Sequence, residues 1–194
     1  MAGLRVAVVQ LERAAGHHFI KAVGATTDSD GRFAFDHLPA GEDYAIFTLV
    51  GEGAQKLVLT TKRFKAHGDR QERNLGDLQV IGALRLAGRL EAPAGQTLPA
   101  DSRIMLVRDP AWDLISVPVE SNGKFTVDGL PPETFAIRIA SKGFEIDGKG
   151  IAYQLLGPQS LGLRLHESVE DLHIPLVASD APRSKPEEAN RKDK

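Results

Sequence analysis

One tryptophan lies in a setting that could bind a ligand. Trp112 stands between two carboxylates, Asp109 and Asp113, in a segment that also contains Pro110. A flat aromatic ring can stack on the apolar face of a sugar, and carboxylates accept hydrogen bonds from its hydroxyl groups. The trio is therefore a candidate carbohydrate platform. The interpretation that we favour is that the ring of Trp112 closes the end of a β-sandwich, and the sugar platform is the alternative.

A second candidate contact surface is a strand without a polar face. Between residues 44 and 50 both alternating sets are apolar, one being Ala45, Phe47 and Leu49 and the other Tyr44, Ile46 and Val50. Side chains alternate between the two faces of a strand, so both faces are expected to be covered. Phe47 and Leu49 are therefore candidate contacts with a partner. Packing between two modules of the same chain is the alternative.

Residues typical of catalysis and metal binding lack the spacing that those functions need. The pair Asp28 and Asp30, followed by Gly31, begins like a calcium loop but does not continue as one, and is typical of a turn. The six histidines show no zinc-site spacing, and Ser160 has one residue too many before it for a Gly-x-Ser-x-Gly elbow. Cysteine is absent, which excludes thiolate catalysis, disulfides and Cys-ligated zinc. We expect no enzyme, no metal site and no cofactor.

The composition of the chain limits the classes of partner that it is expected to bind. The 194 residues carry a formal net charge of −2, without the clustered Lys and Arg that bind phosphate backbones, so no nucleic-acid partner is expected. No stretch has the 18 or more apolar residues of a membrane span, and the first residues do not read as a secretory signal. The compartment is left open.

The elements that must position these residues are predicted to be β-strands. Leucines at 84, 86 and 90 alternate with charged residues, and residues 135–139, 161–165 and 172–176 show the same period of two. The 19 glycines and 11 prolines fall between such short apolar runs, as expected for many strands joined by turns. No stretch shows a helical stripe with caps. The sequence predicts an all-β protein.

The chain repeats itself. Residues 27–39, Thr-Asp-Ser-Asp-Gly-Arg-Phe-Ala-Phe-Asp-His-Leu-Pro, correspond to residues 119–131, Val-Glu-Ser-Asn-Gly-Lys-Phe-Thr-Val-Asp-Gly-Leu-Pro, and Gly31 and Gly123 are 92 positions apart. Upstream, residues 9–13 parallel 104–108, and downstream 44–46 parallel 135–137. Three segments in the same order indicate duplication. The glycines are predicted to have φ > 0 and to close β-hairpins.

The pattern Thr-Asp-x-Asp-Gly-Arg-Phe-x-Phe-x-x-Leu-Pro-x-Gly-x-x-Tyr, from Thr27 to Tyr44, resembles the carboxypeptidase regulatory-like domain. That family has a transthyretin-like (prealbumin-like) β-sandwich of about seven strands, and is similar to collagen-adhesin B-type repeats. The second copy departs from the pattern at Glu133 and Phe135. The resemblance implies an accessory module, often extracytoplasmic, with a fold that also occurs among carbohydrate-binding proteins.

These observations predict two tandem β-sandwich modules, residues 1–80 and 81–178, and a disordered charged tail, 179–194. The second module begins with an apolar strand at about 83–91, and the first has no counterpart. We therefore expect upstream sequence or another chain to supply the missing strand. The leading function is a non-catalytic structural or interaction module of a larger cell-envelope or secreted protein, whose partner is a protein or the remainder of that chain. The alternatives are a glycan-binding module that uses Trp112 and, third, a small hydrolase on the same sandwich.

Overall fold

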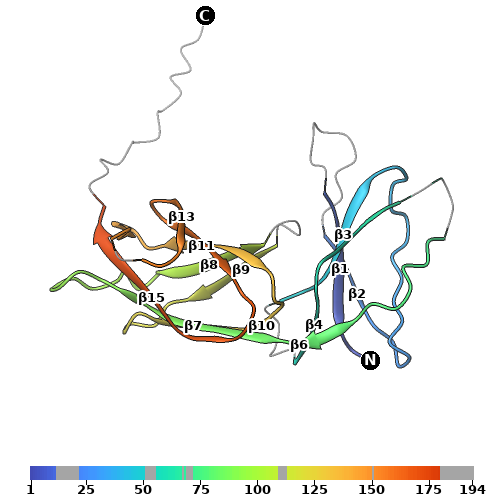
Figure 1. Cartoon of the computed structure of the whole chain (residues 1–194), viewed down its shortest axis with the longest axis horizontal. Helices are drawn as coiled ribbons and strands as arrows, with labels where there is room; N and C mark the ends of the chain where they lie inside the picture. Colours follow the sequence, from blue (N-terminus) through green and yellow to red (C-terminus); the bar gives the residue numbers. More distant parts are fainter. Residues whose placement is uncertain are drawn as a thin grey trace, which may run out of the picture.

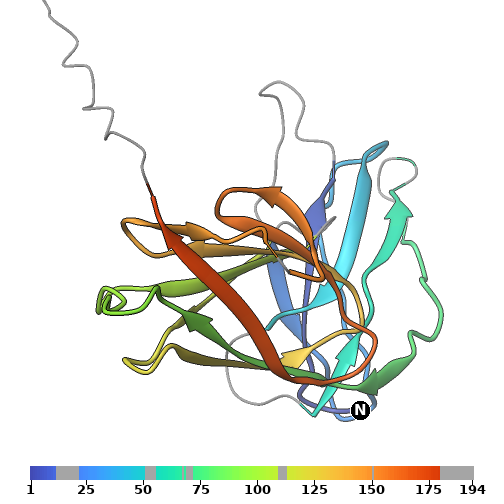
Figure 2. The same cartoon turned by 60° about the vertical axis from the view of Figure 1, so that its left-hand side comes forward.

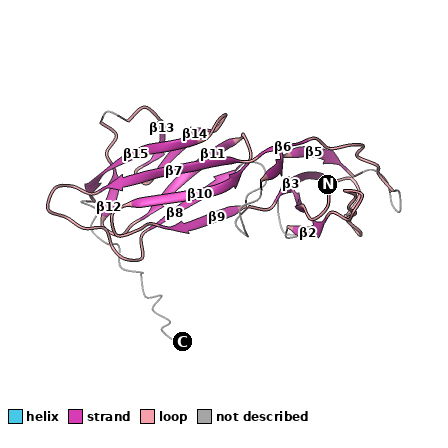
Figure 3. Cartoon of the chain, turned by 90° about the horizontal axis from the view of Figure 1, so that it is seen from below, coloured by secondary structure: helices cyan, strands magenta, loops and turns pink. Residues whose placement is uncertain are grey.

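The computed structural model describes residues 1–11, 22–50, 56–66, 68, 72–108, 113–149 and 151–179. In this part of the chain there are strands and loops but no helix (Figure 3). The expected all-β class is therefore confirmed. No helix in the described ranges is long and apolar enough to span a membrane.

The strands before residue 83 form one group of sheets. A four-stranded antiparallel sheet has the order β2-β1-β3-β5, and a separate pair joins β4 to β6. Every residue from Tyr44 to Thr48 in β3 is buried, as are Val6 to Gln10 in β1, so the two central strands are covered on both faces. The bounds are β1 Arg5–Gln10, β2 Val23–Thr26, β3 Asp43–Thr48, β4 Leu57–Leu59, β5 Lys62–Lys65 and β6 Val80–Gly82.

The strands from residue 84 onward form a sandwich of two sheets, with orders β10-β7-β15-β12 and β13-β14-β11-β8-β9 (Figures 1 and 2). Alternate residues of both sheets fill one core, because successive side chains of each strand point to opposite faces. The bounds are β7 Leu84–Glu91, β8 Arg103–Arg108, β9 Leu114–Pro118, β10 Lys124–Leu130, β11 Thr134–Ala140, β12 Phe144–Ile146, β13 Gln154–Gly157, β14 Ser160–Arg164 and β15 Val169–Ala178.

The internal repeat extends to strand pairing. In β3, Tyr44 lies opposite Gln10, and in β11 the corresponding Phe135 lies opposite Arg108. Residues 6–10 therefore correspond to 104–108, and the parallel drawn from the sequence between 9–13 and 104–108 was wrong by three residues. Because β1 is apolar on both faces, its residue pattern does not define a unique register.

The two repeat glycines occupy turns, as predicted. Gly31 has φ 81° and Gly123 has φ 84°. Each turn is closed by a backbone hydrogen bond, from Gly31 N to Asp28 O and from Gly123 N to Glu120 O. The prediction that Gly123 closes a β-hairpin was wrong, because β9 and β10 on either side of it belong to different sheets. The turn is an arch from one layer of the sandwich to the other.

One strand of the C-terminal group has no counterpart in the described part of the N-terminal group. Strand β7 pairs antiparallel with β10 and parallel with β15. Residues 32–38, which repeat β10, and residues 72–79, which precede β6, contain no strand. The expectation that upstream sequence or another chain supplies a missing strand stays a prediction. The expected tail falls almost wholly outside the described residues.

Candidate functional site

The N-terminal and C-terminal groups of strands lie side by side (Figure 1). They meet around the side chain of Arg108, at the end of β8. This side chain has an exposed fraction of 0%. A guanidinium remains charged in proteins, and a buried charge is tolerated only when it is paired and hydrogen-bonded. The contacts of Arg108 therefore define the chemistry of this junction.

Two carboxylates of the C-terminal group lie beside the guanidinium of Arg108. Its Nε donates to Asp113 Oδ1 and its Nη2 to Asp113 Oδ2, both at 2.7 Å. This bidentate geometry is the strongest form of the pair. Glu133 lies on the other side, with its Oε2 3.6 Å from Arg108 Nη1.

The N-terminal group supplies the remaining contacts. Arg108 Nη2 also donates to the backbone oxygen of Thr48 at 2.5 Å, and the guanidinium carbon lies 4.8 Å from the centre of the Phe47 ring. Glu133 Oε1 accepts a hydrogen bond from the backbone nitrogen of Thr61. A carbonyl, an aromatic face and an amide from one group thus meet an arginine and a carboxylate from the other.

The equivalent place in the N-terminal group has a glutamine where the C-terminal group has an arginine. Gln10 corresponds to Arg108 and Glu42 to Glu133, because each acid stands two residues before the paired Tyr44 or Phe135. Gln10 Nε2 donates to Glu42 Oε2 at 2.9 Å. The buried positive charge is therefore a feature of the C-terminal copy, at the end that faces its neighbour.

Of the five contact residues predicted from the sequence, the structure brings two together. Asp113 and Phe47 both contact Arg108. Leu49 is half-buried and packs on a small cluster that includes Phe47. Trp112 and Asp109 lie outside the described residues. Both oxygens of Asp113 bind Arg108, so this carboxylate is engaged within the chain and not held ready for a sugar hydroxyl.

Sequence reasoning missed Arg108, Glu133 and Thr48. A signal for Arg108 was present, since it follows Ile104 and Leu106 on the inward-facing set of its strand. A charge in that series indicates a buried pair or an interface. Glu133 was noted only as a departure from the family pattern, and the contact of Thr48 is made by its backbone, which leaves no trace in the sequence.

The other candidate residues have local roles. Asp28 Oδ1 accepts hydrogen bonds from the backbone nitrogens of Asp30 and Arg32, which supports the turn and not the calcium loop. His37, His166 and His173 are exposed, and His17, His18 and His67 lie outside the described residues. Among the described residues, no three His, Asp or Glu side chains gather as a metal site would require.

His173 forms an exposed charged group on β15. Its Nδ1 lies 2.9 Å from Glu91 Oε1 and its Nε2 lies 2.8 Å from Asp171 Oδ1. The hydrogen bond with Glu91, followed by the charge of Asp171, raises the pKa of His173 above its ordinary value of 6.5. This group lies on the C-terminal sandwich and takes no part in the junction.

Comparison with known proteins gives structural likeness only. No protein-family model matches the chain, and no curated protein matches it in sequence. A minor pilin of Streptococcus agalactiae is 13% identical with a TM-score of 0.40, over 95% of this chain and 87% of that one. A streptococcal ancillary pilin is 16% identical with a TM-score of 0.36, over 90% and 57%. The shaft pilin SpaA of Lactobacillus rhamnosus GG is 8% identical with a TM-score of 0.34, over 94% and 90%. At these scores the likeness carries no argument about function.

Proposed function

We propose that this chain is a non-catalytic structural or interaction module of a larger cell-envelope or secreted protein. In this proposal residues 1–82 and 83–178 are two tandem β-sandwich modules, and the chain holds them at a fixed angle as a rigid spacer. The boundary lies two residues after the one predicted from the sequence, because β6 (Val80–Gly82) pairs with β4. The observation that carries the proposal is the buried Arg108, whose partners come from both groups of strands.

Two physical features favour a rigid connection. Domains joined by a flexible linker move relative to each other unless their interface is large or specific. Here β6 ends at Gly82 and β7 begins at Leu84, so one residue separates the groups. Opening the junction would also remove the Thr48 carbonyl and the Phe47 ring from Arg108.

The residue pattern from Thr27 to Tyr44 supports an accessory role. It resembles the carboxypeptidase regulatory-like domain, whose members are attached to larger proteins and are often extracytoplasmic. A carbohydrate-binding role for Trp112 has no comparable support, because its neighbour Asp113 is engaged by Arg108.

Distance measurements between spin labels test the rigid spacer. The chain contains no cysteine, so Arg63→Cys on β5 and Thr126→Cys on β10 would be the only labelled sites, both on exposed positions. Pulsed electron paramagnetic resonance on the labelled protein is expected to give one narrow distance distribution. Arg108→Met should broaden it, whereas Arg138→Met, an exposed arginine on β11, should not.

A broad distribution in the unmodified junction would overturn the proposal. An equally narrow one with Arg108→Met would show that the Arg108 contacts do not fix the angle.

A further inference from the structure

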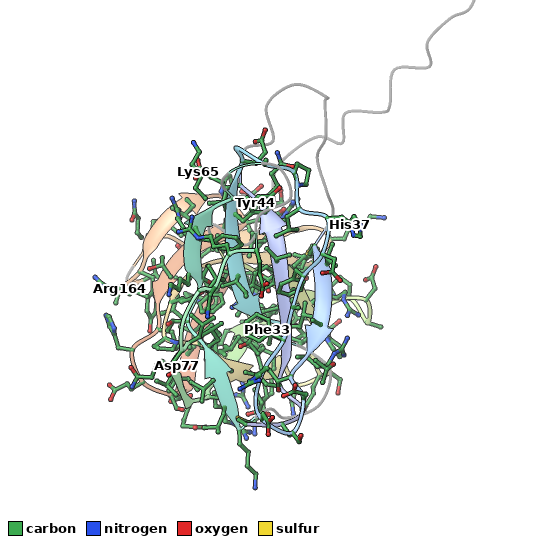
Figure 4. All side chains as sticks on the ribbon, turned by 90° about the vertical axis from the view of Figure 1, so that its right-hand side faces the viewer. Phe33, His37, Tyr44, Lys65, Asp77 and Arg164 are labelled. Atoms are coloured by element: carbon green, nitrogen blue, oxygen red, sulfur yellow. The ribbon has the colours of Figure 1, made fainter. Side chains whose placement is uncertain are left out.

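Within the described residues, two segments of the N-terminal group lack the strand that joins their equivalents in the C-terminal group. Residues 32–38 repeat β10. Residues 72–79 correspond to the first part of β15, because Leu59 pairs with Val80 as Ile146 pairs with Leu176. Within the described part, no backbone–backbone hydrogen bond joins residues 33–38 or 72–79 to another strand. Two side chains do bond to the second segment, because Lys62 Nζ donates to Leu75 O and Gly76 N donates to Asn74 Oδ1. Both segments lie on the right-hand side of Figure 1, and Figure 4 turns that side to the viewer, with Asp77 on one flank and His37 on the other.

The side chains of these segments keep the alternation of a sheet but remain partly open to solvent. Phe33, Phe35 and Leu38 are half-buried, whereas the equivalent Phe125, Val127 and Leu130 have exposed fractions of 2%, 3% and 0%. On the other segment Leu78 is half-buried, and its equivalent Ile174 is at 0%. In the C-terminal group β7 lies between β10 and β15 and covers these side chains.

We propose that the strand position between residues 32–38 and 72–79, which β7 fills in the C-terminal group and which we call the groove, binds an extended strand of a partner polypeptide. The incoming strand would run antiparallel to 32–38 and parallel to 72–79, as β7 does with β10 and β15. Its backbone would pair with backbone groups of both segments that now have no backbone partner, and its alternate apolar side chains would complete the core. This binding site is separate from the junction and goes beyond the proposed spacer function.

The ring of Phe33 should select for glycine at one position of the incoming strand. In the C-terminal group Gly88 lies opposite Phe125. A Cβ atom on Gly88 would lie 2.9 Å from Phe125 Cζ and 2.3 Å from the backbone oxygen of Leu172. Phe33 is the equivalent of Phe125, so a strand in the N-terminal groove requires glycine opposite Phe33.

One carboxylate beside the groove favours a basic residue in the incoming strand. In the C-terminal group Arg85 of β7 lies 3.5 Å from Asp128 of β10 and 3.5 Å from Glu170 of β15. Asp36 is the equivalent of Asp128, it is exposed, and within the described residues it forms no ion pair. A partner strand with Arg or Lys at the position of Arg85 would complement it.

Met1 occupies one end of the groove. A Cβ on Gly31 would lie 2.3 Å from the backbone nitrogen of Met1, and at the equivalent Gly123 the nearest atom is the backbone oxygen of Leu90, at 2.2 Å. Met1 thus stands where β7 ends in the other copy. The partner strand must displace it, together with the hydrogen bond from Thr27 Oγ1 to Met1 O.

A synthetic peptide with the sequence of residues 83–92, Ala-Leu-Arg-Leu-Ala-Gly-Arg-Leu-Glu-Ala, has every required feature and serves as the probe. It would be added to the full chain, and amide hydrogen exchange would be followed by mass spectrometry. Exchange in residues 32–38 and 72–79 is expected to slow at least tenfold at saturating peptide. The matched control is the same peptide with Gly88→Val, which should give no protection.

Three outcomes would overturn the proposal. The first is no protection at millimolar peptide, and the second is equal protection by the control peptide. The third is protection of these segments that rises with protein concentration in the absence of peptide, which would make a second copy of the chain the occupant.

Discussion

Replacement of Arg108 by methionine should strongly destabilise the protein. The substitution keeps much of the apolar side-chain volume but removes the charge that Asp113 and Glu133 face. Their side chains are 15% and 13% exposed, so both carboxylates would remain largely desolvated without a cation. Removing one partner of a buried ion pair costs about 3–5 kcal/mol. For a chain of this length that corresponds to a fall in melting temperature of roughly 6–20 °C.

Urea unfolding followed by far-ultraviolet circular dichroism measures this loss. Arg108→Lys should recover part of it, because lysine keeps the charge but cannot form the bidentate contact with Asp113. Arg138→Met on the exposed face of β11 is the control and should change stability by about 0.5 kcal/mol or less. The double variant Arg108→Met/Asp113→Ala should lose less than the sum of its single variants, because one unpaired carboxylate is gone. A loss below about 1 kcal/mol for Arg108→Met would refute the view of Arg108 as a buried ionic centre.

Three further measurements follow from the geometry. Gly88→Val should destabilise the C-terminal sandwich by about 1–3 kcal/mol or more in thermal unfolding, because the added atoms overlap the Leu172 backbone. A folded variant of unchanged stability would contradict the tight approach of β7 and β15. Gly31→Val and Gly123→Val should each lower the free energy of unfolding by about 1 kcal/mol or more, since both positions have positive φ. The loss should be larger at Gly123, where the added atoms would clash with β7. Unchanged melting temperatures would rule out the strained turns. In an NMR titration His173 should show a pKa above 6.5, which Glu91→Gln lowers. Because the folded-state pKa is raised, the stabilisation from this group is fully present below pH 6.5 and is lost as the pH rises through the folded-state value; a titration at or below 6.5 would contradict the hydrogen bond with Glu91.

Much of the fold could be predicted from local pattern. Alternation in segments such as 172–176 identified strands, and the Asp/Asn-Gly pairs identified turns with positive φ. The pairing of the sheets was harder, because a turn residue does not show whether the next strand returns to the same sheet or crosses to the opposite one. The register of β1 was predicted wrongly because this strand is apolar on both faces, so that its residue pattern fits more than one alignment.

The candidate site could be predicted only in part. Phe47 was singled out because both faces of its strand are apolar, and Asp113 because it stands beside Trp112. The residue that contacts both of them, Arg108, was not singled out. Arg108 is isolated in sequence from Thr48 and Glu133, and only the meeting of the two groups of strands brings these residues together. A backbone carbonyl such as that of Thr48 carries no sequence signal at all.

The parallel pairing of β7 with β15 has a mechanical consequence. These are the first and last strands of the C-terminal group, and they run in the same direction. A stretching force applied to the chain on both sides of this group would pull Leu84 and Ala178 from opposite ends of the pair. The hydrogen bonds between the two strands would then be loaded in shear and would resist together, instead of opening one at a time as in a hairpin pulled from its open end. The sandwich is therefore built to transmit tension along the chain without unravelling.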